Sequence, residues 1–404
     1  MEKRVIGKPL LYGDGRVFFA FCPSSGGIFE LEPGEFKALK ENLPEVEELK
    51  KEMLEYDGEE YTIGDFISHL TSLGIELERL NAPAVVIFEL TRNCNLNCKH
   101  CIVSAGKPLP NELTTEEWLK LVDEISDYAV RLTLTGGEPL VHPGFFRILE
   151  RAKEKGLSIR LLTNGTLLEE HAEELGGLLD AKVDEVQVSL DGRKKTHDSI
   201  RGKGSYEKTI AGIKALVREN LPVSVAFTLI PENRGEALGL YREVAKLGIE
   251  SFRIAWGLPA GRLREAVPYA EYLKTVGEVK RASEELGVPV SGGELGAPLE
   301  VKPESFYPCA AGTSQVFIAS TGDVYPCLVL RYPFFRFGNV REEGLIGIWR
   351  KREWERLKRD LSGSDCAKCP LFKSCRGGCP GESLIYRGDY NAPSPACRVK
   401  LEKR

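Results

Sequence analysis

One stretch organises this sequence, Glu89-Leu90-Thr91-Arg92-Asn93-Cys94-Asn95-Leu96-Asn97-Cys98-Lys99-His100-Cys101, which follows the apolar run Val85-Val86-Ile87-Phe88. It holds three cysteines in the spacing C-x3-C-x2-C. Thiolates are soft ligands that suit iron-sulfur clusters or zinc, and both sites usually take four protein ligands. No fourth cysteine lies at loop spacing. The stretch therefore predicts either a cluster with one open iron or a zinc site completed by His100 or by a distant residue.

From Ala84 to about Ala255, strand-like runs alternate with amphipathic segments, which predicts parallel βα units. The expected strands span 85–90, 130–135, 158–163, 185–190, 223–230 and 251–254, with helices such as 115–128 and 206–219 between them. Barrel sites lie at the carboxyl ends of the strands. We therefore expect the loops after these strands to form one site with the cysteine loop.

Three of these loops carry short motifs. After the second strand comes Thr135-Gly136-Gly137-Glu138-Pro139, where glycine lets the backbone approach a ligand and proline fixes the turn. Thr163-Asn164-Gly165-Thr166 follows the third strand and Ser189-Leu190-Asp191-Gly192 the fourth. In an extended segment Ser189 and Asp191 point to the same face, although Asp-Gly is also a common tight turn.

This set of motifs resembles the signature of the radical S-adenosylmethionine (SAM) enzymes. The resemblance implies that Cys94, Cys98 and Cys101 hold a 4Fe-4S cluster whose open iron is chelated by SAM. Reductive cleavage of SAM then gives a 5′-deoxyadenosyl radical that abstracts hydrogen from substrate. It also implies SAM contacts from Gly136, Gly137, Glu138, Pro139, Asn164, Ser189, Asp191 and Arg201. For Arg201, whose guanidinium suits the SAM carboxylate, a surface salt bridge is the alternative.

Seven cysteines lie in the C-terminal region: Cys309, Cys327, Cys366, Cys369, Cys375, Cys379 and Cys397. The run C-x2-C-x5-C-x3-C alone suits a zinc ribbon. The full spacing resembles the SPASM extension, which carries two auxiliary 4Fe-4S clusters in radical SAM maturases. By that resemblance Cys366, Cys369, Cys375 and Cys397 hold the outer cluster, and Cys309, Cys327 and Cys379 the inner one.

Two details refine this resemblance. The inner cluster lacks a fourth cysteine, so either Cys22 completes it or one iron stays open. In sulfatase-maturing relatives an Asp follows the second SPASM cysteine, whereas Leu328 follows Cys327 here. This departure disfavours sulfatase maturation.

Residues 1–82 predict a small α+β module in which the strands 16–21 and 27–31 form a hairpin, followed by helical stretches. This order is similar to the winged-helix peptide-recognition module of some radical SAM enzymes, and an unrelated small cap is the alternative. The expected fold is α/β, a partial (β/α)6 barrel over residues 83–300, with the module at 1–82 and the SPASM domain at 301–404.

The composition and charge of the chain limit the classes of function that it can have. The chain has 404 residues, 42% apolar and 28% charged, as in globular proteins. A net charge of -5 offers no basic footprint for nucleic acid. No apolar run is long enough for a membrane span or signal peptide, which predicts a cytoplasmic protein. Eleven cysteines in a reducing compartment favour metal over disulfides. Abundant charges with two Met give a thermophile-like composition.

The sequence thus predicts a radical SAM/SPASM maturase that oxidatively modifies a peptide or protein. Its electron comes from a low-potential donor such as ferredoxin or flavodoxin. The alternative is a related enzyme acting on a small molecule or metallocofactor, of the haem-precursor or tungsten/molybdenum-cofactor type. A non-enzymatic iron-sulfur electron carrier would need no Gly-Gly-Glu-Pro motif.

Overall fold

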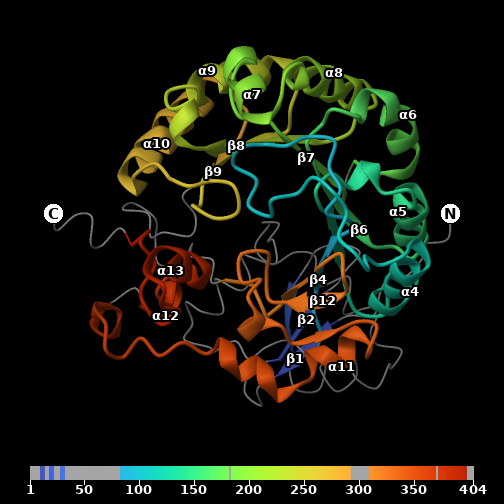
Figure 1. Cartoon of the computed structure of the whole chain (residues 1–404), viewed down its shortest axis with the longest axis vertical. Helices are drawn as coiled ribbons and strands as arrows, with labels where there is room; N and C mark the ends of the chain where they lie inside the picture. The colour runs from blue at the N-terminus through green and yellow to red at the C-terminus, as the bar shows by residue number, and fades with distance from the viewer. Residues whose placement is uncertain are drawn as a thin grey trace.

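The computed structural model describes residues 10–13, 18–21, 28–31, 82–181, 183–292, 309–369 and 372–397. Its centre is a run of six parallel strands, each paired with the next in the chain (Figure 1). These strands are β4 (Val85–Glu89), β5 (Arg131–Thr135), β6 (Ser158–Thr163), β7 (Glu185–Ser189), β8 (Val223–Leu229) and β9 (Ser251–Trp256). All six expected strands are confirmed, and their ends agree with the expected ones to within two residues.

Helices follow the outer side of this curved sheet as an arc (Figure 1). They are α4 (Thr115–Ile125), α5 (Phe145–Glu154), α6 (Leu168–Leu178), α7 (Lys194–Arg201), α8 (Ser205–Arg218), α9 (Ala237–Val244) and α10 (Tyr269–Leu286). The expected helices 115–128 and 206–219 are α4 and α8. Helix α4 begins at a capping box between Thr114 and Glu117 and ends earlier than expected, at Ile125.

The barrel does not close, because other strands occupy both of its edges. Strand β10 (Val290–Ser291) pairs in parallel with β9, and β11 (Gln315–Ile318) pairs in parallel with β4. Beyond β11 come β12 (Asp323–Tyr325) and β13 (Gly338–Asn339), both antiparallel. Among the described residues the sheet thus has ten strands, and it continues across the boundary predicted at residue 300.

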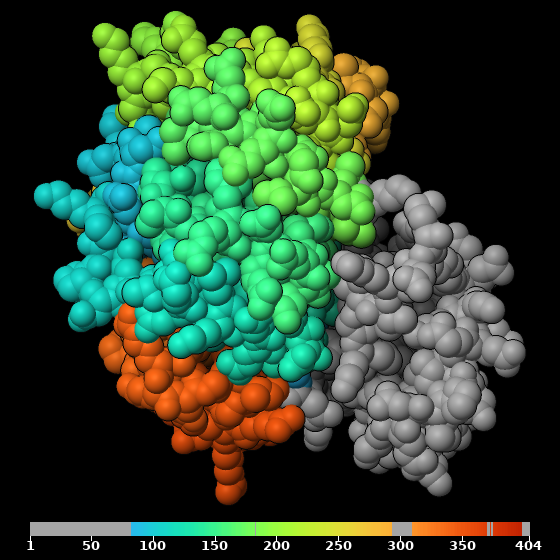
Figure 2. Space-filling view, turned by 90° about the vertical axis from the view of Figure 1, so that its right-hand side faces the viewer, coloured from blue at the N-terminus to red at the C-terminus, as the bar shows by residue number. Residues whose placement is uncertain are grey.

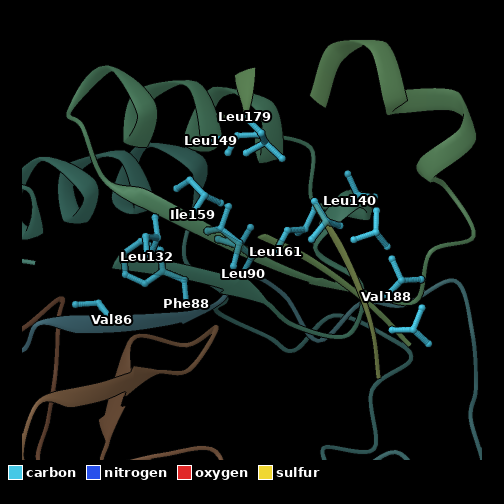
Figure 3. Packing of buried hydrophobic residues seen from close by; sticks show 14 of the residues in the cluster. Val86, Phe88, Leu90, Leu132, Leu140, Leu149, Ile159, Leu161, Leu179 and Val188 are labelled. Carbon is cyan, nitrogen blue, oxygen red and sulfur yellow. The ribbon is translucent and has the colours of Figure 1, made fainter. Parts of the chain in front are cut away.

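The core lies between the sheet and the helices (Figure 3). Phe88 of β4 and Trp118 of α4 are both fully buried, with ring centroids 4.6 Å apart. Leu132 and Ile159 continue the same layer on the next two strands. Along β6 burial alternates residue by residue, as expected for a strand with one face under helices.

The C-terminal segment packs against the first part of the barrel, and Figure 2 shows its orange part beside the teal residues. Its helices are α11 (Leu345–Trp349), α12 (Phe372–Cys375) and α13 (Pro380–Arg387). Arg341 joins the two parts, since its Nε lies 2.6 Å from Glu117 and its Nη atoms donate to the carbonyls of Asn111 and Glu112.

Near the N-terminus, β1 (Leu10–Gly13), β2 (Phe18–Phe21) and β3 (Ile28–Leu31) form an antiparallel sheet in the order β1-β2-β3. The predicted hairpin is β2 and β3, and β1 is an additional strand. The helical stretches expected after them, on which the winged-helix comparison depends, lie outside the described residues. No helix in the described ranges has the length and apolar character to cross a membrane.

Candidate active site and cluster-binding cysteines

The cysteine loop begins where β4 ends, and its backbone is fixed before the first cysteine. The Glu112 carboxylate accepts hydrogen bonds from the Thr91 hydroxyl and the Arg92 N–H, both at 2.7 Å. The Cys94 N–H donates to the Gly106 carbonyl at 3.1 Å, which closes the loop. These bonds hold the loop at the carboxyl edge of the sheet.

Each of the three sulfurs faces an N–H group. Leu96 N lies 3.4 Å from Cys94 Sγ, Ala105 N lies 3.4 Å from Cys101 Sγ, and Arg201 Nη1 lies 3.9 Å from Cys98 Sγ. Burial raises the pKa of Cys94 to about 11 and also raises that of Cys98. Because N–H donors and a guanidinium favour thiolates, this donor set fits a cluster held by three cysteines.

The contacts of His100 disfavour only one of its ring nitrogens as a zinc ligand, because Nδ1 has no hydrogen-bond partner among the described residues. His100 Nε2 lies 3.0 Å from Asp191 Oδ2, so this nitrogen is already paired. Within the described ranges, no three Cys, His, Asp or Glu side chains are grouped so as to hold a single metal ion.

The Gly-Gly-Glu-Pro motif packs directly on the cysteine loop. The Gly137 N–H donates to the Thr91 carbonyl at 2.7 Å, and the Glu138 N–H donates to the Asn93 carbonyl at 2.9 Å. A Cβ on Gly137 would lie 2.2 Å from the Asn93 oxygen, so only glycine fits there. Gly136 precedes this contact and the buried Pro139 follows it.

Glu138 joins this motif to the next strand end. Its carboxylate is fully buried and accepts bonds from the Thr163 hydroxyl and the Asn164 N–H, both at 2.8 Å. Burial raises its pKa to about 7. The resemblance assigns this acid to SAM. In the structure the carboxylate binds the neighbouring turn, and its contact with SAM stays a prediction.

Asn164 lies beside the first cysteine, as the predicted site requires. Its Nδ2 donates to Asn95 Oδ1 at 2.8 Å and lies 3.9 Å from Cys94 Sγ. Its Oδ1 accepts from the Thr166 N–H at 2.9 Å. The turn after β6 is therefore attached to the cysteine loop by side chains.

Arg201 and Asp191 form a buried ion pair, with Arg201 Nε 2.6 Å from Asp191 Oδ2. Burial alone would raise the pKa of Asp191, but Arg201 and His100 hold it well below its usual range. The second oxygen accepts from the Thr228 N–H at 2.7 Å. The Arg201 side chain is only 9% exposed, so the surface salt-bridge alternative is wrong.

Ser189 and Asp191, which were expected on one face of the strand end, differ in their exposure to solvent. Ser189 is half-buried, whereas Asp191 is fully buried and both of its oxygens are engaged. This geometry assigns Asp191 the role of orienting Arg201. A contact with the SAM ribose stays a prediction for Ser189 and is disfavoured for Asp191.

Sequence reasoning missed three side chains that surround Asp191. His100 contacts its carboxylate, His197 Nδ1 accepts from its N–H at 3.1 Å, and Asn233 Nδ2 donates to its carbonyl at 3.1 Å. The position of His100 inside the cysteine loop was the one available signal. The other two contacts join separate loops, so no local pattern reveals them.

The three predicted inner-cluster cysteines lie near enough to influence one another's pKa. Burial is the main cause that raises the pKa of Cys379, and the neighbouring Glu382, Cys309 and Cys327 raise it further. Burial, followed by Cys309, raises the pKa of Cys327 to about 12. The N–H groups of Val329 and Leu330 donate to the Cys327 sulfur, as N–H groups do at iron-sulfur sites.

The predicted outer set is grouped in the same way. Burial raises the pKa of Cys366, with Cys397 and Cys369 as neighbouring thiols that add to the shift. Cys375 has Cys397 and Cys366 beside it. Both donor sets fit iron-sulfur clusters, while Cys22 lies outside the described residues.

The chain matches the model of the radical SAM superfamily over residues 88–244 and that of the SPASM iron-sulfur cluster-binding domain over 309–379. It is 32% identical over 351 residues to an AdoMet-dependent heme synthase of Methanosarcina barkeri, covering 80% of this chain and 99% of that protein. It is 28% identical over 333 residues to the mycofactocin maturase MftC of Mycolicibacterium smegmatis, covering 79% and 83%.

The chain is also similar to a solved structure, that of Streptococcus suis SuiB bound to the precursor peptide SuiA. The TM-score is 0.73 at 16% sequence identity, covering 97% of this chain and 98% of that one. At this identity the likeness concerns the fold.

Proposed function

Because the chain belongs to the radical SAM superfamily and carries a SPASM domain, we propose that it is a maturase that oxidatively modifies a peptide or protein. One observation carries the choice of substrate. The heme synthase is matched over 99% of its length by 80% of this chain, so about a fifth of the chain has no counterpart there. SuiB, whose structure holds a precursor peptide, matches 97% of this chain.

The N-terminal sheet supports the same substrate class. In the order β1-β2-β3, β1 and β3 are the edge strands among the described residues. An exposed sheet edge can bind an extended peptide by adding it as a further strand, with main-chain hydrogen bonds supplying affinity. We therefore assign peptide recognition to residues 1–82.

When bound, the cluster and SAM supply a 5′-deoxyadenosyl radical that takes a hydrogen atom from a substrate C–H bond. The chain's own residues prepare this chemistry. Cys94, Cys98 and Cys101 would hold the cluster, and the fixed Arg201 directs a guanidinium edge toward Cys98. Asp191, which is fully buried, keeps that guanidinium in place without exposing its own charge.

The C-terminal cysteines support a net oxidation. After a hydrogen atom leaves the substrate, one further electron and a proton must depart to complete a two-electron oxidation. Clusters held by the seven SPASM cysteines would take that electron. A low-potential ferredoxin or flavodoxin would supply the electron that starts the reaction. Leu328 after Cys327 disfavours sulfatase maturation.

The second candidate is an enzyme for a small molecule such as a haem precursor. It is favoured by the 32% identity to a heme synthase over nearly all of that protein. In this second candidate function, residues 1–82 make no contact with the substrate.

Deleting residues 1–82 tests the proposal. The predicted SAM motifs all lie after Pro83, so the truncated chain should still release 5′-deoxyadenosine. Full-length protein should remove two hydrogens from its precursor peptide, as read by mass spectrometry, and the truncated chain should not. Conversion of a haem precursor by both forms would favour the second candidate. Unchanged peptide modification by the truncated chain would reject recognition by residues 1–82.

A further inference from the structure

The loop after β9, residues 257–263, packs on the cysteine loop and brings a second arginine to it. We propose that Arg262 is a positioning residue for the cluster that Cys94, Cys98 and Cys101 would hold. It fixes the segment 98–105, and its charge raises the reduction potential of that cluster. The proposal rests on the radical SAM assignment of these cysteines and does not depend on the class of substrate.

Arg262 binds three backbone carbonyls of the cysteine loop. Its Nε donates to the Cys98 carbonyl at 2.6 Å, and its Nη1 donates to the Ala105 carbonyl at 2.7 Å. Its backbone N–H donates to the Cys101 carbonyl at 3.0 Å. A guanidinium presents its donors in a rigid, planar fork, so this one side chain holds the two ends of the segment 98–105 at a set separation.

The segment 98–105 has a backbone conformation that requires such support. The Cys101 N–H donates to the Cys98 carbonyl at a long 3.4 Å, and the Ser104 N–H donates to the Cys101 carbonyl at 3.1 Å. Ser104 has a φ of 52°, in the left-handed region that is unfavourable for residues other than glycine. Such a conformation persists where surrounding contacts hold it, and Arg262 supplies three of these contacts.

The two neighbours of this arginine fix the loop that carries it. Gly261 has a φ of 63°, and a Cβ there would lie 2.3 Å from the Cys101 oxygen, so the two loops touch with no room for a side chain. Leu263 is buried in an apolar cluster with Ile200 and Ile230. The arginine between them is therefore held against the cysteine loop by the backbone as well as by its own side chain.

The charge of Arg262 is not balanced by a carboxylate among the described residues, because its side-chain bonds there go to carbonyl oxygens. Arg201, the other guanidinium at this loop, is paired with Asp191. Arg262 is half-buried, so solvent screens its charge incompletely. Net charge and hydrogen bonding around an iron-sulfur cluster set its reduction potential. Because reduction adds a negative charge to the cluster, an unbalanced guanidinium beside it favours the reduced form, which is the form that cleaves SAM.

The test compares substitutions of Arg262 in the full-length, anaerobically reconstituted protein. SAM alters the electron paramagnetic resonance signal of the cluster that it binds, so the SAM-responsive signal identifies this cluster among the three. Arg262→Gln keeps an N–H donor and removes the charge. We expect the midpoint potential of the SAM-responsive signal to fall in a redox titration, while the potentials of the auxiliary signals stay unchanged. Arg262→Lys retains the charge and should retain the wild-type potential.

Further measurements separate the charge from the geometry. A lysine ammonium lacks the planar fork, so Arg262→Lys should release 5′-deoxyadenosine more slowly than the wild type at an unchanged potential. Arg264→Gln removes an exposed charge two residues away and is the matched control, with the wild-type potential expected. Gly261→Ala should lose the SAM-responsive signal and about four irons, the content of one cluster, and should keep the auxiliary signals.

A wild-type midpoint potential in Arg262→Gln, or an equal fall in Arg264→Gln, would reject the role of the Arg262 charge. If Arg262→Gln cannot be loaded with iron, a lowered potential in Arg262→Lys rejects that role in its place. A wild-type signal and iron content in Gly261→Ala would reject the close contact between the two loops. A wild-type protein that loads its clusters and shows no SAM-responsive signal would contradict the radical SAM assignment itself, so the two failures are distinguishable.

Discussion

Asp191→Asn isolates the buried charge pair at the active site. The carboxylate meets N–H donors on both oxygens: Thr228 on one, and Arg201 and His100 on the other. Asparagine has the same shape but presents a donor at one of its two positions. Whichever way the amide is turned, an N–H group then faces another N–H group, and the buried Arg201 loses its counter-charge.

The magnitude follows from burial. Asp191 is fully buried and the Arg201 side chain is 9% exposed, so solvent screens the pair poorly. Removing one partner of such a pair lowers the free energy of unfolding by about 3–5 kcal/mol. The same replacement at Asp123, whose pair with Arg151 is exposed, should change it far less.

Urea unfolding of the cluster-free proteins, followed by circular dichroism, compares the two variants. Hydrogen exchange at the Thr228 amide gives a local readout, and Asp191→Asn should reduce its protection. Adding Arg201→Met should recover part of the lost stability, because no uncompensated charge remains. Equal urea midpoints for the Asp191 and Asp123 variants would show that the buried pair does not act as described.

Three other changes test the surroundings of the site. Gly137→Ala should prevent normal cluster assembly, read as lost iron, because its Cβ would lie 2.2 Å from the Asn93 carbonyl; normal iron loading would refute that close packing. Arg331→Met should lower stability by about 3 kcal/mol in urea unfolding, because it leaves the buried Glu89, 2.6 Å from Arg331 Nη1, without that partner; no change in midpoint would be inconsistent with this account. Glu138 has a folded-state pKa near 7, above its unfolded value, so its ionisation lowers stability by about 3 kcal/mol as pH rises from about 4.5 to 7. Glu138→Gln should remove that loss from the pH profile of the apoprotein, and an unaltered profile would argue against it.

The parallel half of the fold could be predicted because its signals are local. β-branched runs, turn residues and amphipathic segments predicted β4 to β9 and the helices α4 and α8 between them, and the radical SAM and SPASM resemblance is confirmed by both family models. The short strands β10 to β13 carry no comparable pattern. Strand β11 pairs with β4, which lies more than 200 residues earlier in the chain, and no feature of the four residues of β11 indicates that partner.

The same distinction between local and long-range signals applies to the residues of the site. The cysteines and the motif glycines were identified from spacing, because a cluster loop and a close backbone approach limit which residues fit. The environment of Asp191 was not, since burial and the contacts with His100 and Asn233 arise only when separate loops meet.

The most direct test of the assignment is SAM cleavage without substrate. Anaerobically reconstituted wild-type protein, supplied with dithionite and SAM, should release 5′-deoxyadenosine, measured by chromatography. Cys98→Ala should release none while keeping the iron bound by the SPASM cysteines. If the wild-type protein assembles its clusters and releases no 5′-deoxyadenosine, or if Cys98→Ala releases as much as the wild type, the site built on Cys94, Cys98 and Cys101 does not perform the assigned chemistry.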